Sequence, residues 1–312
     1  MRRRRRIARP PPCLGAHMRI AKIFGTAAAV AALVGAGLAA PSSAAPATLA
    51  APPQIPADAV QVHLQQFQSI GTANGGNRAH GRPGYRASAD YVKGKLDAAG
   101  FTTTLQSFTH NGATGWNVIA DWPQGDANQV VFLGAHLDSV AAGPGLNDNA
   151  SGSAAVLETA LTLARTKPTV QKRLRFGWWG AEELGLIGSK YYASRLPAAE
   201  RTRIKTYLNF DMVGAKNTTT WGVYTDNAAL RQQFDAHFRA KGIPTRGVNI
   251  AGRSDHASFA GIGVPVSGIT SGNDPCYHQR CDTITNVTAG VVATGATAAA
   301  DLAWNLAGAA RR

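Results

Sequence analysis

The sequence predicts an α/β fold in which a mixed, mostly parallel β-sheet is sandwiched between helices. Segments with helical periodicity alternate along the chain with short strand-like runs. Those runs are almost continuously apolar, which is typical of strands that are covered on both faces. After about residue 60 the chain contains no internal repeat and no linker rich in Pro, Gly or Ser. We therefore expect a single domain, 46–312, with one sizeable core.

In chain order, two amphipathic helices come first, because apolar residues recur every three to four positions in 56–70 and 86–100. Strand-like runs follow at 101–108, 116–122 and 128–137. The remaining elements are a helix at 151–165, strands at 173–180, 206–214 and 218–225, a helix at 227–242 and a strand at 264–270. Ligands on sheets of this kind bind outside the carboxyl ends of the strands. Functional residues should therefore follow the apolar runs.

The segment before the domain has the organisation of a secretory signal peptide. It contains no acid, and from Met18 a short basic stretch precedes an apolar run rich in Ala and Gly, with small residues near Ala44 and Ala45. We expect 1–45 to be a signal peptide with a basic pre-segment, removed on export, rather than a permanent membrane anchor. The residues before Met18 are either a long basic n-region or the product of an upstream start codon that is not used.

The charge of the remaining chain argues against a nucleic-acid partner. Eight of the 32 Lys and Arg residues, but none of the 18 acids, precede residue 46, which leaves a net charge of about +6. The basic residues are dispersed instead of forming a run or stripe. We expect a monomer that binds no nucleic acid and does not associate stably with membranes.

Two cysteines remain in the domain, Cys276 and Cys281, five positions apart in CYHQRC. In an exported chain this spacing points to a disulfide. The alternative is half of a cysteine metal site, but no second cysteine pair exists to complete four ligands. A disulfide would fix the intervening Tyr277 and His278.

Acids and a histidine gather at the strand ends. They are His136 and Asp138, Asp148 in the following loop, Glu182 and Glu183, and Asp211, with His278 later in CYHQRC. Carboxylates in one crevice repel one another unless cations lie between them. Histidine and carboxylate ligands suit zinc in an open, catalytic arrangement, and a carboxylate can bridge two ions roughly 3.5–4 Å apart. The pattern therefore predicts two divalent metal ions.

Asp138 and the paired glutamates are expected to differ in role. Residues two apart on an extended chain share a face, so Asp138 can accept the second N–H of the His136 imidazole and fix its tautomer. Adjacent residues at a strand end diverge. One of Glu182 and Glu183 can therefore bind metal while the other serves as general base.

Six motifs occur in the order GAHLDSV, GLNDNASG, WWGAEELGLIGS, NFDMVG, GRSDHASF and CYHQRCD. Together they resemble the secreted bacterial leucyl aminopeptidases of the aminopeptidase Y family, which are co-catalytic dizinc exopeptidases. The resemblance runs from about residue 55 to the C-terminus. It implies the zinc-dependent exopeptidase fold and hydrolysis of N-terminal, preferably apolar, residues from peptides with a free N-terminus.

The resemblance also implies how two Zn²⁺ ions would be bound. His136 and Asp211 would hold one zinc ion. Glu183 and His278 would hold the other, and Asp148 would bridge the two.

Three further residues acquire roles through the same resemblance. Glu182 would be the catalytic base, Tyr277 would donate a hydrogen bond to the developing oxyanion, and Arg253 with its neighbours would help to bind substrate.

The sequence differs from those of the similar secreted enzymes in two features. Only the three residues 273–275 separate VPVSGITSG from CYHQRC, where similar enzymes carry a longer segment lining the pocket, and Thr270 stands where they tend to have an aromatic residue. Some relatives bind calcium through acids near the mature N-terminus and in a C-terminal helix, but 286–300 contain no acid. Calcium is therefore not expected.

Three other functions fit the same fold less well. A single-zinc glutaminyl cyclase needs only three ligands, whereas this chain keeps five. Carboxypeptidase relatives usually carry dedicated basic residues for the substrate carboxylate and often an additional domain. A metal-free binding protein would have lost ligands, and none is lost here. The sequence thus predicts a secreted zinc aminopeptidase.

Overall fold

The apolar runs pair into one mixed sheet flanked by helices, which confirms the predicted fold class. The computed structural model describes residues 53–272 and 274–310. In these ranges the sheet has eight strands. They are β1 (Thr102–His110), β2 (Ala113–Asp121), β3 (Asp126–His136), β4 (Lys172–Trp179), β5 (Ile204–Phe210), β6 (Trp221–Tyr224), β7 (Thr245–Val248) and β8 (Val266–Thr270).

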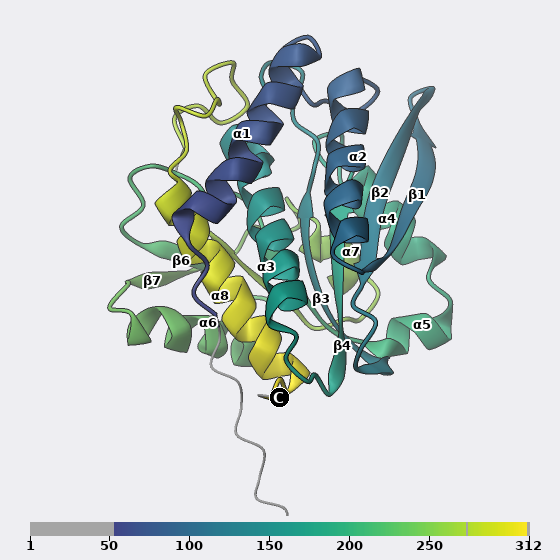
Figure 1. Cartoon of the computed structure of the whole chain (residues 1–312), viewed down its shortest axis with the longest axis vertical. Helices are drawn as coiled ribbons and strands as arrows, with labels where there is room; N and C mark the ends of the chain where they lie inside the picture. Colours follow the sequence, from purple (N-terminus) through teal and green to yellow (C-terminus); the bar gives the residue numbers. More distant parts are fainter. Residues whose placement is uncertain (1–52, 273, 311–312) are drawn as a thin grey trace, which may run out of the picture. The chain divides into compact units, whose positions relative to one another are not determined.

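The strand order brings the carboxyl ends of three central strands to the same edge of the sheet. The order is β1-β2-β4-β3-β5-β8-β6-β7. Strand β3 is parallel to both β4 and β5, and β5 is parallel to β8. The pairs β1–β2, β2–β4 and β6–β8 are antiparallel, whereas β6 and β7 are parallel. Because β3, β4 and β5 run in the same direction, their carboxyl ends meet at one edge of the sheet (Figure 1).

Helices cover both faces of the sheet (Figure 1). One face carries α1 (Ala57–Ala73), α2 (Pro83–Ala98), α3 (Gly152–Thr166) and α8 (Ala289–Ala307), and α6 (Ala228–Ala240) packs beside α8. The π-helical turn η1 (Leu146–Ser151) leads directly into α3. On the other side α4 (Ile187–Arg195) packs against α7 (His256–Ala260), and α5 (Ala198–Arg203) leads into β5.

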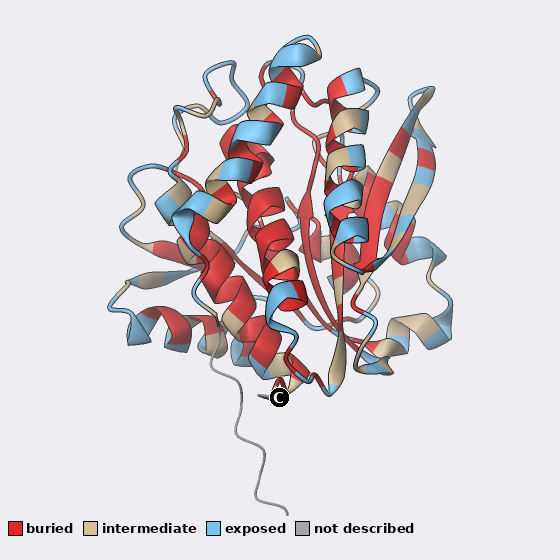
Figure 2. Ribbon diagram, viewed as in Figure 1, coloured by how far each residue is buried: buried red, intermediate tan, exposed pale blue. Residues whose placement is uncertain are grey.

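Two adjacent tryptophans at the end of β4 show how the sheet separates two cores. Trp178 belongs to the large cluster with α1, α2, α3 and α8, whereas Trp179 belongs to a smaller one with Tyr192 and Phe259 of α4 and α7. Neighbouring residues of a strand point to opposite faces, so both rings are fully buried. Figure 2 shows the same separation, with buried central strands and exposed residues on the outward sides of α1 and α2.

Helix α8 and strand β7 were missing from the sequence-based prediction, as were the shorter helices α4, α5 and α7. Helix α8 is rich in Ala and is buried nearly all round, so it lacks the polar face that reveals an amphipathic helix. Strand β7 has four residues at the edge of the sheet, and two of them are exposed. The predicted strand at 206–214 also ends early, because β5 stops at Phe210. That stop leaves Asp211 in the loop after the strand.

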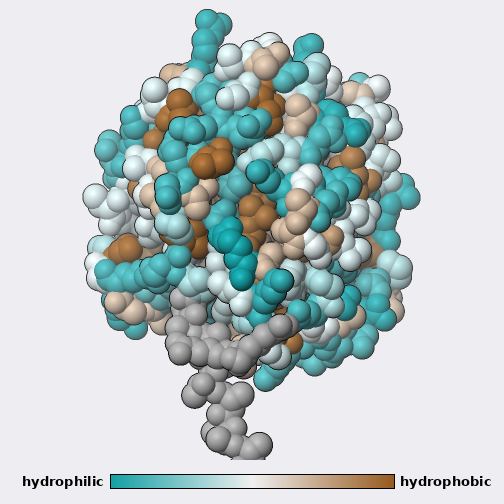
Figure 3. Space-filling view, in the orientation of Figure 1, coloured by the Kyte–Doolittle hydropathy of each residue, from teal (hydrophilic) through white to brown (hydrophobic). Residues whose placement is uncertain are grey.

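The predicted signal peptide, 1–45, lies outside the described residues. All described residues belong to the unit Pro46–Arg312. None of the helices in 53–272 and 274–310 is long and apolar enough to span a bilayer. On the face shown in Figure 3, hydrophobic residues form separate small patches among hydrophilic ones.

Candidate metal centre

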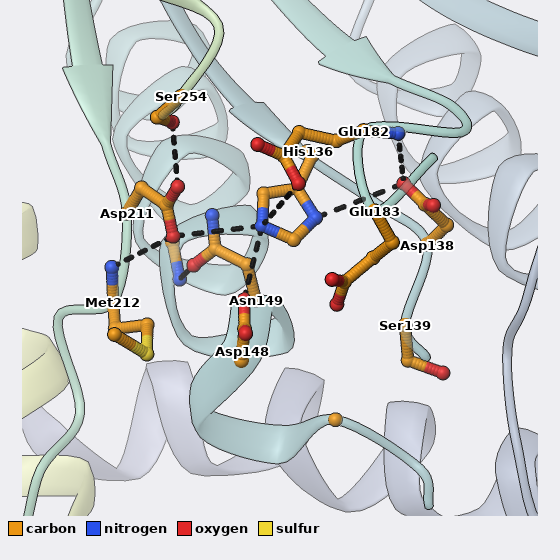
Figure 4. Close-up of polar contacts among 12 residues, drawn as sticks. His136, Asp138, Ser139, Asp148, Asn149, Glu182, Glu183, Asp211, Met212 and Ser254 are labelled. Atoms are coloured by element: carbon orange, nitrogen blue, oxygen red, sulfur yellow. Dashed lines mark hydrogen bonds and ion pairs between the residues drawn. The ribbon is translucent and has the colours of Figure 1, made fainter. Parts of the chain in front are cut away.

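Polar residues at or after the carboxyl ends of the parallel strands lie close together in the structure. His136 is the last residue of β3, and Asp211 directly follows β5. Glu182 and Glu183 lie in the loop three and four residues after the end of β4. Asp148 comes from the turn η1 that precedes α3. Figure 4 shows these side chains converging.

The candidate ligands form two groups of three that share one residue. The first ligand group is His136, Asp148 and Asp211, and the second ligand group is Asp148, Glu183 and His278. Within each group the ligand atoms all lie within 4.8 Å of one another. The five residues predicted as metal ligands are therefore brought together by the fold.

Asp148 faces both groups through different oxygens. Its Oδ1 lies 3.1 Å from His136 Nε2, and its Oδ2 lies 3.2 Å from His278 Nε2. His136 Nε2 is also 3.5 Å from Asp211 Oδ1, and His278 Nε2 is 2.9 Å from Glu183 Oε2. A carboxylate with one oxygen directed at each centre has the arrangement of a bridging ligand.

The two neighbouring glutamates differ in their relation to the ligand groups, as the sequence analysis expected. Glu183 lies in the second ligand group, whereas Glu182 lies in neither. The Glu182 carboxylate is nevertheless close, with Oε2 3.9 Å from His136 Nε2, and it lines the adjoining cavity. Glu182 thus borders the ligands without belonging to them.

Asp138 contacts the site differently from the expectation. Its Oδ1 is 3.7 Å from His136 Nδ1, which is longer than a hydrogen bond. The same oxygen accepts a hydrogen bond from the backbone N–H of Glu182 at 3.0 Å. Asp138 is fully buried, so this bond fixes the start of the loop that carries both glutamates.

The acids of the site are buried close together, so they need compensating positive charge. Burial, with nearby acids, raises the pKa of Glu182 to about 10 and that of Glu183 to about 8. Burial alone would lower the pKa of His136, but the carboxylates of Glu182 and Asp211 raise it well above its usual value. Without metal, protons therefore supply the positive charge that these acids need.

The donor atoms fit divalent metal ions. Glu183 Oε1 is buried and has no hydrogen-bond partner, a costly arrangement unless a cation binds it. All the ligands are imidazole nitrogens and carboxylate oxygens, the set found in open zinc sites. The residues present therefore fit zinc.

The loop that carries Tyr277 and His278 is closed by the predicted disulfide. Cys276 and Cys281 are bonded, with their Cα atoms 5.4 Å apart. The Tyr277 ring stacks on the His278 ring at 3.8 Å between centroids. The Tyr277 side chain is half exposed and lines the cavity, and partial burial beside several acids raises its pKa to about 12. Its hydroxyl therefore remains a hydrogen-bond donor at neutral pH.

Residues that the sequence analysis overlooked hold the ligands in place. Asp282 accepts hydrogen bonds from the backbone N–H groups of Asn147 and Asp148 at 2.8 and 3.0 Å. Ser254 Oγ donates to Asp211 Oδ2 at 2.5 Å (Figure 4). Both residues lie inside motifs singled out above, CYHQRCD and GRSDHASF, and that position was the only signal for them.

A cavity of about 890 Å³ opens beside the ligand groups. Its wall includes His136, Glu182 and Asp211, together with residues of β6, β7 and β8. Arg253 and Thr270, which the sequence analysis placed near the substrate, both line this cavity.

Comparison with known proteins identifies relatives of the whole described domain. Residues 117–303 match the model of peptidase family M28. Leupeptin-inactivating enzyme 1 of Streptomyces exfoliatus is 51% identical over 94% of this chain and 72% of that protein. An aminopeptidase of Pseudomonas aeruginosa is 41% identical over 55% of this chain, but the match spans only 38% of that longer protein.

Solved structures share the fold. A zinc aminopeptidase from Bacillus subtilis matches with a TM-score of 0.72 at 17% identity, covering 80% of this chain and 95% of that one. A glutaminyl cyclase from Bacteroides thetaiotaomicron matches with a TM-score of 0.70 at 18% identity, covering 82% and 99%. At such identities the likeness concerns the fold, and that fold carries more than one activity.

Proposed function

The chain belongs to peptidase family M28, and from this premise we propose that it is a secreted dizinc aminopeptidase that removes N-terminal, preferably apolar, residues from peptides. The observation that carries the proposal is the pair of ligand groups sharing Asp148. A single-zinc relative would need only three ligands, whereas both groups are complete here. The relatives named as aminopeptidases support the same reaction.

His136, Asp148 and Asp211 would hold one zinc ion, and Asp148, Glu183 and His278 the other. Bound zinc would act as a Lewis acid on the scissile carbonyl and would lower the pKa of the attacking water. The chain's own residues then orient the substrate and move the protons.

Glu182 is the proposed general base and acid. Its carboxylate lines the cavity but belongs to neither ligand group, so it is free to take a proton from the attacking water and deliver it to the leaving amine. The backbone bond to Asp138 holds it in position. The Tyr277 hydroxyl, which also lines the cavity, would donate to the oxyanion that develops on the carbonyl oxygen.

Secretion rests on the N-terminal sequence and on the disulfide. Residues 1–45 have the order of charge, apolar run and small residues expected of a signal peptide. The Cys276–Cys281 disulfide suits an oxidising compartment. We propose that the domain acts outside the cell as a monomer, without calcium.

Peptides with a blocked N-terminus are expected not to be cleaved. The free α-ammonium group of a substrate would lie beside the carboxylates of Glu182 and Asp211, and acetylation removes that cation and leaves the acids without a partner. The measurement compares initial rates on leucyl-p-nitroanilide and its N-acetyl derivative. Faster cleavage of the acetylated compound would overturn the aminopeptidase proposal.

The preference among apolar first residues is expected to be shallow. Thr270 lines the cavity where similar enzymes tend to carry an aromatic ring, so this wall removes less apolar surface from water. Each buried methylene contributes about 1 kcal/mol or less, and the ratio of kcat/KM between leucyl and alanyl p-nitroanilides should stay below about a hundredfold. A Thr270→Phe variant should raise that ratio. A wild-type ratio far above a hundredfold would contradict an open pocket.

A further inference from the structure

Two arginines line the cavity beside the ligand groups, and among the described residues their terminal guanidinium nitrogens have no partner. Arg246 and Arg253 are both exposed and both belong to its wall. Arg253 is expected to bind substrate, but Arg246 lies on β7, which the sequence analysis did not identify. We propose that Arg246, with Arg253, forms a subsite for a carboxylate group of the substrate. This inference rests on the proposed function.

The sheet directs Arg246 towards the cavity. A side chain added at Gly222 of β6 would meet Thr270 Cγ2 at 2.7 Å and Val248 Cγ1 at 3.0 Å, so Thr270 and Val248 share one face of the sheet. Arg246 precedes Val248 by two residues and therefore points to the same face. It also pairs in register with Gly222, which pairs with Thr270 on the other side. Arg246 thus extends the wall formed by Thr270.

In the part of the chain that the structure describes, neither guanidinium is fully paired. The side chain of Arg246 takes part in no hydrogen bond and no ion pair within residues 53–272 and 274–310. Within the same ranges Arg253 donates only from Nε, to the carbonyl oxygen of Ile250 at 3.2 Å, and its two terminal nitrogens have no partner. A guanidinium presents paired N–H donors that match the two oxygens of a carboxylate.

The acids of the cavity are already engaged. They are Asp148, Glu182, Asp211 and Asp274. Asp148 and Asp211 belong to the ligand groups, and Glu182 is the proposed base. Asp274 Oδ1 accepts from the Cys276 N–H at 2.7 Å, and its Oδ2 accepts from Asn147 Nδ2 at 2.7 Å. The cavity acids therefore leave the Arg246 guanidinium available to a carboxylate of the substrate.

The carboxylate could belong to the first side chain, the second side chain or the C-terminus of the peptide. Matched peptide pairs distinguish these three positions. The first pair is the amides of Glu-Ala and Gln-Ala, which differ in the first side chain. The second is the amides of Leu-Glu and Leu-Gln, which differ in the second side chain. The third is Leu-Ala with a free C-terminus and its amide. In at least one pair we expect the wild-type kcat/KM to favour the carboxylate-bearing member about tenfold, as for one charge-assisted contact.

The variants assign that preference to Arg246. Arg246→Gln should bring the ratio close to one, and Arg246→Lys should retain part of it because the charge remains. Arg239→Gln, which removes a similarly exposed arginine of α6 outside this cavity, should leave the ratio unchanged. Raising the ionic strength should reduce the preference of the wild type, an effect that a purely structural role would not produce.

The outcomes distinguish this inference from the function on which it rests. Equal cleavage of both members of every pair, or an unchanged ratio in Arg246→Gln of normal melting temperature, would overturn the carboxylate subsite and leave the aminopeptidase intact. Cleavage of N-acetylated peptides that depends on their free C-terminus would instead overturn the aminopeptidase proposal and indicate a carboxypeptidase.

Discussion

Replacing Glu182 with Gln is expected to lower kcat by several orders of magnitude. A general acid–base group typically contributes about 10²- to 10⁴-fold, and here one carboxylate would serve both proton transfers. The amide keeps the size of the side chain but cannot accept the proton. Glu182 lies outside both ligand groups, so the variant should retain its bound zinc. Single-turnover and steady-state rates on leucyl-p-nitroanilide, with zinc measured per chain, test this expectation.

A matched control is Glu200→Gln in α5, where the carboxylate pairs with Arg203 on the surface. Loss of that exposed pair should change neither kcat nor zinc content. If Glu182→Gln kept more than a tenth of the wild-type kcat with its zinc intact, Glu182 would not be the proton carrier.

Chelation of the metal ions is expected to abolish activity and to lower the melting temperature. The carboxylates of the two ligand groups are largely buried, and within each group they lie within 4.8 Å of a histidine nitrogen and of each other. Without cations their repulsion and desolvation favour the unfolded chain, and the binding free energy of the metal is lost from the folded state. Thermal unfolding before and after dialysis against chelator measures the effect.

The return of the metals provides the control for chelation. Zinc added to the chelated protein should restore both activity and melting temperature, whereas calcium should restore neither. Asp148→Asn, which weakens the residue shared by both groups, should respond less to the chelator than the wild type. A chelated protein that keeps its full activity and melting temperature would exclude a metal-dependent reaction.

The sequence predicted the central part of the fold because its strands are buried on both faces. Strands β3, β4 and β5 give nearly continuous apolar runs, and a histidine or an acid lies at the end of each run or within four residues after it. Since parallel strands end at the same edge, this order alone indicated that His136, Glu183 and Asp211 lie together. In the structure His136 and Asp211 belong to the first ligand group and Glu183 to the second, and the two groups share Asp148.

The contacts that support the ligands could not be predicted in the same way. The bond from the Asp148 N–H to Asp282 joins residues 134 positions apart, and no local period encodes such a pairing. The sequence pattern placed Asp138 beside His136, and its Oδ1 does face His136 Nδ1 at 3.7 Å, but the hydrogen bond from the Glu182 N–H to that oxygen was not predictable. Arg246 went unnoticed because the short edge strand β7 carries little apolar signal.

The most direct test of the account is an anomalous difference map at the zinc absorption edge, from crystals of the protein grown with zinc. The account predicts two peaks, one among His136, Asp148 and Asp211 and the other among Asp148, Glu183 and His278, with the Glu182 carboxylate bound to neither. A single peak, or a peak coordinated by Glu182, would contradict it.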